Sequence, residues 1–229
     1  LASGPSMIVQ ELSVLRSAYP NIKIENIFDP TKSDWKIIIS KDDKTMELYW
    51  AEGRYLPANL LGSKEKYRKL IFYIPKKLAD PATFSDAQIE EIRAFGSSES
   101  RETAPISATS FFEAIYDTST RKDVERHITK TMFLGKQVSV HEEIVELLAR
   151  VEEQILAAAQ TDDAVKAFMK SISSIEGYSW RQIRDTNGIS FHSMGLAIDI
   201  LPRSWQNKII YWNWEKNKGN EDWMLIPLS

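Results

Sequence analysis

Near the N-terminus, apolar positions follow two different periods. Residues 6–18 carry an apolar side chain at every third or fourth position, which predicts an amphipathic helix that ends before Pro20. Residues 35–40 and 46–50 are rich in aromatic and branched side chains and are joined by the polar segment 41–44. This arrangement is typical of a β-hairpin. We therefore predict a mixed N-terminal region of helix and strand.

From residue 85 onward, apolar residues recur mainly at helical spacing. We expect helices at residues 86–95, 110–116, 121–132, 140–160 and 162–171. In the longest of these segments, one apolar stripe predicts a helix packed against a core. The stripe consists of Ile144, Leu147, Leu148, Val151, Ile155 and Leu156. Ser139 is the expected N-cap of this helix, which places His141 in its first turn.

A segment rich in Ser, Glu and Thr, residues 96–105, predicts a surface loop. We therefore divide the chain into an N-terminal mixed region, residues 1–100, and a C-terminal region, residues 101–229, which form either two units or one continuous domain. The elements together predict an α+β protein in which helices cover a small antiparallel sheet. A strand of this sheet is expected around residues 197–201, where an apolar run follows Gly195.

Composition narrows the classes of protein to which the chain can belong. With 229 residues, 43% hydrophobic content and seven tryptophans, it can bury a full core and is globular. A net charge of -3 with dispersed Lys and Arg gives no reason to expect nucleic acid or an anionic membrane as a partner. The absence of Cys excludes disulfides and thiolate zinc sites. No segment has the apolar length of a transmembrane helix.

The candidate chemistry lies in residues 181–201. His192 and Asp199 are seven residues apart, on either side of Gly195. Because the apolar run after the glycine predicts a buried strand, the carboxylate of Asp199 must be paired, hydrogen-bonded or bound to a cation. An imidazole nitrogen beside a carboxylate oxygen suits zinc. A structural hydrogen bond between His192 and Asp199 is the alternative, and their spacing alone does not decide between the two.

Ser190, His192, Gly195, Ala197 and Asp199 match the pattern S-x-H-x-x-G-x-A-x-D. In this pattern the chain resembles the zinc D-alanyl-D-alanine carboxypeptidase family, which includes the vancomycin-resistance D,D-peptidases and several phage endolysins. The resemblance covers about 25 of the 229 residues, from Gly177 to Leu201. It implies the fold that D-Ala-D-Ala metallopeptidases share with hedgehog-type domains.

The same resemblance implies roles for individual residues. His192 and Asp199 would be two of the three protein ligands of Zn2+. Arg181 would bind a substrate carboxylate or polarise the scissile carbonyl, and a planar, permanently charged guanidinium suits both tasks. Ser190 would shape the turn that enters the substrate-binding site. Arg184 is a second candidate for a substrate contact, although a solvated surface charge explains it more simply.

The chain departs from the family pattern after Asp199. Members of the family close the site with a downstream histidine that is preceded by an acidic general base, but no histidine follows His192. Glu221, Trp223 and Met224 resemble the closing E-x-W-H element with methionine in the ligand position, yet they lie closer to Asp199 than that element usually does. We therefore expect either that a final segment with the third ligand and the base is missing, or that this homologue has discarded catalysis.

The two remaining histidines, His127 and His141, are predicted to be structural. A site closed by either of them, or by Glu221, is the alternative. Residues 1–6 contain neither a basic region nor an apolar core, so we expect that any signal peptide has already been removed.

The resemblance implies zinc-dependent hydrolysis of a peptidoglycan-derived peptide, with release of a C-terminal D-alanine, in the bacterial periplasm or cell envelope. An L-alanyl-D-glutamate endopeptidase and a non-catalytic module that binds wall peptide or a partner protein are the alternatives. With two ligands and no base, the chain as given is expected to hold zinc weakly and to hydrolyse little. The sequence leaves the oligomeric state open.

Overall fold

The computed structural model describes residues 4–70, 80–95, 98–181, 189–205, 215 and 217–220. It is a mixed α+β structure of helices and small antiparallel sheets, which confirms the predicted class. In chain order, with η denoting a 3-10 helix, the elements are α1 (Gly4–Ala18), β1 (Lys23–Asp29), β2 (Asp34–Lys41), β3 (Lys44–Tyr49), η1 (Ala58–Lys66), β4 (Tyr67–Arg68), η2 (Pro81–Thr83), α2 (Asp86–Phe95), α3 (Ser98–Thr103), β5 (Ile106–Ser107), α4 (Ser110–Tyr116), α5 (Arg121–His127), β6 (Ile128–Phe133), β7 (Lys136–His141), η3 (Glu142–Ile144), α6 (Val145–Ala158), α7 (Asp163–Ser171), β8 (Ile172–Glu176), η4 (Phe191–Met194) and β9 (Asp199–Pro202).

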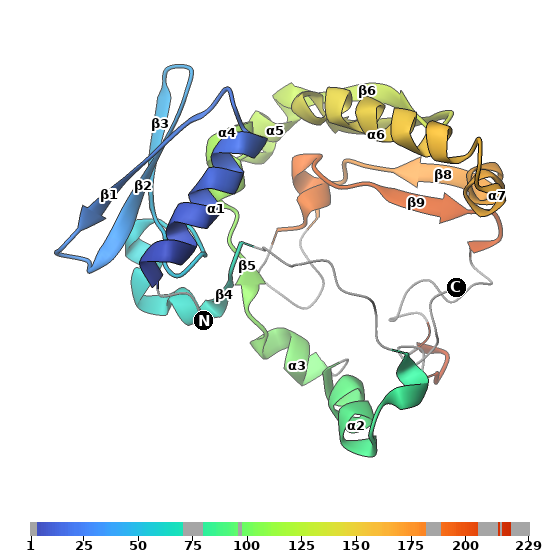
Figure 1. Cartoon of the computed structure of the whole chain (residues 1–229), viewed down its shortest axis with the longest axis horizontal. Coiled ribbons are helices and arrows are strands. Elements are labelled where there is room, and N and C mark those ends of the chain that lie inside the picture. The colour runs from blue at the N-terminus through green and yellow to red at the C-terminus, as the bar shows by residue number, and fades with distance from the viewer. Residues whose placement is uncertain are drawn as a thin grey trace.

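A three-stranded antiparallel sheet of β1, β2 and β3 occupies one end of the molecule, with α1 packed beside it (Figure 1). Helix α4 completes this part from a later segment of the chain. These elements enclose the first core, whose buried residues are Ile8, Leu12, Leu15, Ile24, Ile37, Ile39, Leu48, Trp50, Tyr55, Phe111, Ile115 and Tyr116. The predicted N-terminal helix and hairpin are therefore confirmed, and both bury their apolar side chains here.

Two antiparallel strand pairs, the β6–β7 hairpin and the pair of β8 with β9, form the other end together with α6 and α7 (Figure 1). They enclose a second, smaller core, whose buried residues are Phe133, Val138, Val140, Ile172 and Ile175. The two strand pairs meet where the backbone N–H of Tyr178 donates to the carbonyl of Ser139, at 2.7 Å. Gly177 permits this contact, because a Cβ at that position would lie 2.1 Å from the same carbonyl oxygen.

The helices expected at 121–132 and 140–160 are partly wrong. Helix α5 ends at His127, and the following residues form β6 and β7, so Ser139 lies within a strand and His141 ends it. Leu134 and Gly135 turn between these strands at φ +47° and +73°, the left-handed conformation that two-residue hairpin turns require. The alternation of the buried Val138 and Val140 is typical of a strand. It was overlooked because the helical period that follows was extended back over these residues.

The apolar stripe predicted for the long helix does not pack as a whole. Ile144, Leu148 and Ile155 contact the second core, whereas Leu147, Val151 and Leu156 are exposed. A two-stranded hairpin is narrow, so it covers only part of an apolar face this wide. Part of the expected loop at 96–105 is also helical, as α3. Within the described ranges, no helix combines the length and the apolar character needed to cross a bilayer.

Candidate metal centre

A short 3-10 turn, η4, positions His192. The hydroxyl oxygen of Ser190 accepts a hydrogen bond from the backbone N–H of His192 at 3.3 Å and so caps this turn. The turn ends at Gly195, which adopts φ +69° and donates its N–H to the carbonyl of His192. A Cβ on Gly195 would lie 2.6 Å from the backbone nitrogen of His141, so β7 also requires glycine here.

The imidazole of His192 is held in one tautomer. Its Nδ1 lies 2.8 Å from the carbonyl oxygen of Gly177. Because a carbonyl can only accept a hydrogen bond, Nδ1 carries the proton and, in the neutral ring, Nε2 presents a lone pair. Nε2 lies 3.3 Å from Oδ2 of Asp199. Two acceptors that face each other in this way require a proton or a cation between them.

This spacing fits zinc. Two donors of a tetrahedral zinc ion, each at its usual bond length of about 2.0–2.1 Å, are separated by roughly 3.3 Å. Backbone hydrogen bonding at the distal ring nitrogen is also the arrangement that orients histidine ligands in metal sites. The positions of His192 and Asp199 therefore fit a zinc ion. An ion pair between an imidazolium and the carboxylate gives the same distance.

Asp199 is not buried, contrary to the sequence-based expectation. It is the first residue of β9, opposite Glu176 on β8, and its side chain is 51% exposed. Its neighbours Ile198 and Ile200 pack against the second core. Because side chains alternate along a strand, Asp199 points to the opposite face. The cost of burial therefore does not argue for a cation, and the geometry beside His192 carries that argument alone.

Arg181 is fixed through its main chain. The buried hydroxyl of Ser193 accepts from the N–H of Arg181 at 2.8 Å and lies 2.6 Å from the carbonyl oxygen of the same residue, to which it donates. The guanidinium is half-exposed, with Nη2 3.9 Å from Oδ2 of Asp199. Arg181, His192 and Asp199 thus lie close together. Ser193 was missed, because only the folded turn brings its hydroxyl to Arg181.

These side chains line a cavity of about 320 Å³. The lining residues are Gln137, Val138, Ser139, Ile175, Glu176, Gly177, Tyr178, Ser179, Arg181, His192 and Asp199. Tyr178 donates its hydroxyl to Glu125 at 3.0 Å, and its pKa is raised by burial and by this carboxylate. Sequence reasoning missed Glu176, since strand β8 was not predicted. Ser190 caps the turn behind the cavity and does not line it.

Among the described residues, no cluster of three or more His, Cys, Asp or Glu side chains has the arrangement of a metal site. His192 and Asp199 are thus two candidate ligands without a described third. The remaining histidines lie elsewhere: His141 is buried and donates Nε2–H to the carbonyl of Tyr116, and His127 pairs with Glu142. The candidates Arg184, Glu221, Trp223 and Met224 lie outside the described residues.

Comparison with known proteins adds one finding. Residues 11–72 match the model of a family described as a domain of unknown function, DUF8518. This match covers less than half of the chain and includes most of the first core but none of the cavity around His192. No curated protein and no solved structure is significantly similar to the chain.

Proposed function

We propose that this chain carries the metal-binding part of a zinc-dependent peptidase that acts on bacterial cell-wall peptides in the periplasm or cell envelope. The simplest activity is that of a D-alanyl-D-alanine carboxypeptidase, built on a D-Ala-D-Ala metallopeptidase-like fold around β8 and β9. One observation carries the proposal: the imidazole Nε2 of His192 and the carboxylate Oδ2 of Asp199 face each other at 3.3 Å on a cavity wall.

His192 and Asp199 would hold the zinc ion. When bound, zinc supplies a Lewis acid that lowers the pKa of a water molecule and polarises a substrate carbonyl. The carbonyl of Gly177 keeps the imidazole proton on Nδ1, which leaves the lone pair of Nε2 free to bind a metal ion. Asp199 needs no large desolvation to serve as a ligand, because half of its side chain is exposed.

Arg181 would recognise the substrate. Its guanidinium is permanently charged and presents paired donors that match a carboxylate. It lies 3.9 Å from Asp199 and is half-exposed, so a peptide C-terminus bound there would be held next to the metal ligands. The Ser193 hydroxyl accepts one hydrogen bond from the main chain of Arg181 and donates another to it, which fixes the backbone that carries the guanidinium.

The proposal is tested with the natural full-length protein and the peptide diacetyl-L-lysyl-D-alanyl-D-alanine. We expect release of D-alanine that stops when a chelator removes zinc and returns when zinc is restored. His192→Ala should abolish the release. Zinc-independent release, or none from any wall peptide, would contradict a zinc peptidase.

Arg181→Lys tests the role of the guanidinium. The variant keeps the positive charge but loses the paired donors, so kcat/KM on the free-acid peptide should fall by about 10- to 100-fold while zinc content stays the same. The same peptide with an amidated C-terminus is the control substrate. Equal activity of the wild type on the acid and the amide would remove the carboxylate clamp from the proposal.

A further inference from the structure

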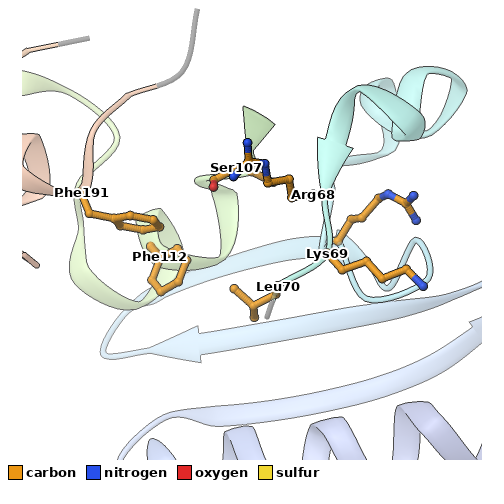
Figure 2. Close-up of a pocket in the computed structure, with 8 residues that line it drawn as sticks. Arg68, Lys69, Leu70, Ser107, Phe112 and Phe191 are labelled. Carbon is orange, nitrogen blue, oxygen red and sulfur yellow. The ribbon is translucent and has the colours of Figure 1, made fainter. Parts of the chain in front are cut away.

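A second cavity, of about 230 Å³, lies where the β4–β5 pair approaches α4 and η4. Its lining residues are Arg54, Arg68, Lys69, Leu70, Ser107, Ala108, Phe112 and Phe191. Figure 2 shows the two phenylalanine rings together on one side, with Arg68 and Lys69 across from them and the Lys69 side chain extending away from the rings. The cavity therefore has an apolar side and a cationic side.

The apolar side is a formed aromatic contact. Phe112 of α4 and Phe191 of η4 meet edge to face, with ring centroids 4.9 Å apart and an interplanar angle of 81°. Both rings are only partly buried, so part of their surface remains available to a third group. Aromatic and other flat apolar groups pack well against such a pair.

On the cationic side, Arg68 and Lys69 have no carboxylate partner among the residues that the structure describes. Nε of Arg68 donates to the carbonyl of Pro105, which leaves its two terminal nitrogens available to a ligand. Lys69 is exposed and forms no ion pair within the described part of the chain. Arg54 is different, because Glu52 and Glu65 neutralise it. None of the described residues that line the cavity is acidic. A guanidinium and an ammonium in this position favour a carboxylate.

We propose that this cavity binds a small carboxylic acid with an apolar, preferably aromatic, body. The carboxylate would pair with Arg68 and Lys69, and the body would pack against Phe112 and Phe191. A volume of about 230 Å³ is below the roughly 300–1,000 Å³ of sites for drug-sized ligands, which limits the ligand to about one amino-acid residue in size. The proposal stands independently of the peptidase activity.

Fluorine NMR titration with (4-fluorophenyl)acetate tests this site, and (4-fluorophenyl)acetamide is the uncharged control probe. We expect the acid to bind about tenfold or more tightly than the amide, since only the acid forms charge-assisted hydrogen bonds. The double variant Arg68→Gln/Lys69→Gln should lower the affinity for the acid to that for the amide. Both replaced side chains are exposed, so the variant should fold normally.

The matched control is Lys64→Gln/Lys66→Gln, which removes the same charge from η1 outside the cavity. It should leave the affinity for the acid unchanged. Equal affinities for the acid and the amide would overturn the proposal. Unchanged affinity in Arg68→Gln/Lys69→Gln would also overturn it, because the acid would then bind elsewhere, for example at Arg181.

Discussion

The two ends of the molecule differ in how many apolar side chains they bury and in which polar side chains they expose. The first core draws buried aliphatic and aromatic residues from α1, the three-stranded sheet and α4. The second core has fewer buried residues, and the cavity beside it is lined by the half-exposed Arg181 and Asp199. Since each fully buried apolar side chain contributes about 1.5–3 kcal/mol, most of the apolar stabilisation lies in the first core. Stability and candidate chemistry are therefore largely separate.

Leu48→Ala should have the largest effect on stability. Leu48 of β3 is fully buried in the first core, so its truncation leaves a cavity and should lower the free energy of unfolding by about 2–5 kcal/mol. Val9→Ala is the control, since Val9 is 65% exposed on α1 and the change should stay within about 0.5 kcal/mol. Urea unfolding measures both variants.

The separation of the two ends also makes a prediction about zinc. While Leu48→Ala remains folded, its zinc affinity should equal that of the wild type, because Leu48 does not line the cavity. A parallel loss of stability and zinc affinity in the folded variant would show that the two ends act as one unit.

Gly195→Ala should have the next largest effect. The added Cβ would meet the backbone of β7 at 2.6 Å and also strain a left-handed φ, so a loss of about 2–4 kcal/mol is expected. Gly135→Ala is the matched control, because its φ is +73° but nothing lies within 4 Å of the added Cβ. It should lose only about 1 kcal/mol from the backbone strain.

The difference between these two glycine variants measures the contact of η4 with β7. Gly195→Ala should also weaken zinc binding, because the turn that orients His192 must shift. Equal losses of stability in the two variants would mean that the approach of η4 to His141 is looser than the structure indicates.

The smallest expected effect is on pH dependence. Burial lowers the pKa of His141, whose Nε2–H donates to the carbonyl of Tyr116 and whose Nδ1 accepts from the N–H of Glu143. Between the folded and unfolded pKa values, the unfolded chain binds more protons than the folded protein. The free energy of unfolding should therefore fall as the pH drops below about 6.5, the ordinary histidine value.

Replacement of His141 isolates this contribution. Glutamine cannot titrate, so His141→Gln should show a shallower fall in the free energy of unfolding between about pH 7 and about pH 5. Urea titrations at several pH values measure this slope. An unchanged slope in the variant would assign the pH dependence to other groups.

Local patterns predicted the elements whose periodicity is undisturbed by neighbours. The spacing of Ile8, Leu12 and Leu15 predicted α1. The motif selected His192 and Asp199, which are 3.3 Å apart in the structure. The sequence pattern did not predict the β6–β7 hairpin, because a helical period begins directly after His141. The exposure of Asp199 could not be predicted either, since an apolar run does not tell which face of its strand meets a core.

Contacts between residues of different helices and strands could not be predicted from sequence patterns. The hydroxyl of Ser193 reaches Arg181 only when η4 has formed, and Glu176 stands beside Asp199 only when β8 pairs with β9. The carbonyl of Gly177 that sets the tautomer of His192 is a backbone group, and no side-chain motif encodes it. Such partners depend on tertiary packing, which residue spacing along the chain does not specify.

Calorimetric zinc titration of the natural full-length protein, as the wild type and with Asp199→Asn or Glu176→Gln, tests the central claim most directly. The two substitutions remove the same charge from paired positions on β9 and β8, but only Asp199 faces Nε2 of His192. We predict saturable binding of one zinc ion per chain, weakened by about a hundredfold in Asp199→Asn and little changed in Glu176→Gln. Equal affinities in Asp199→Asn and the wild type, or no saturable binding in the wild type, would show that His192 and Asp199 form an ion pair and not a metal centre.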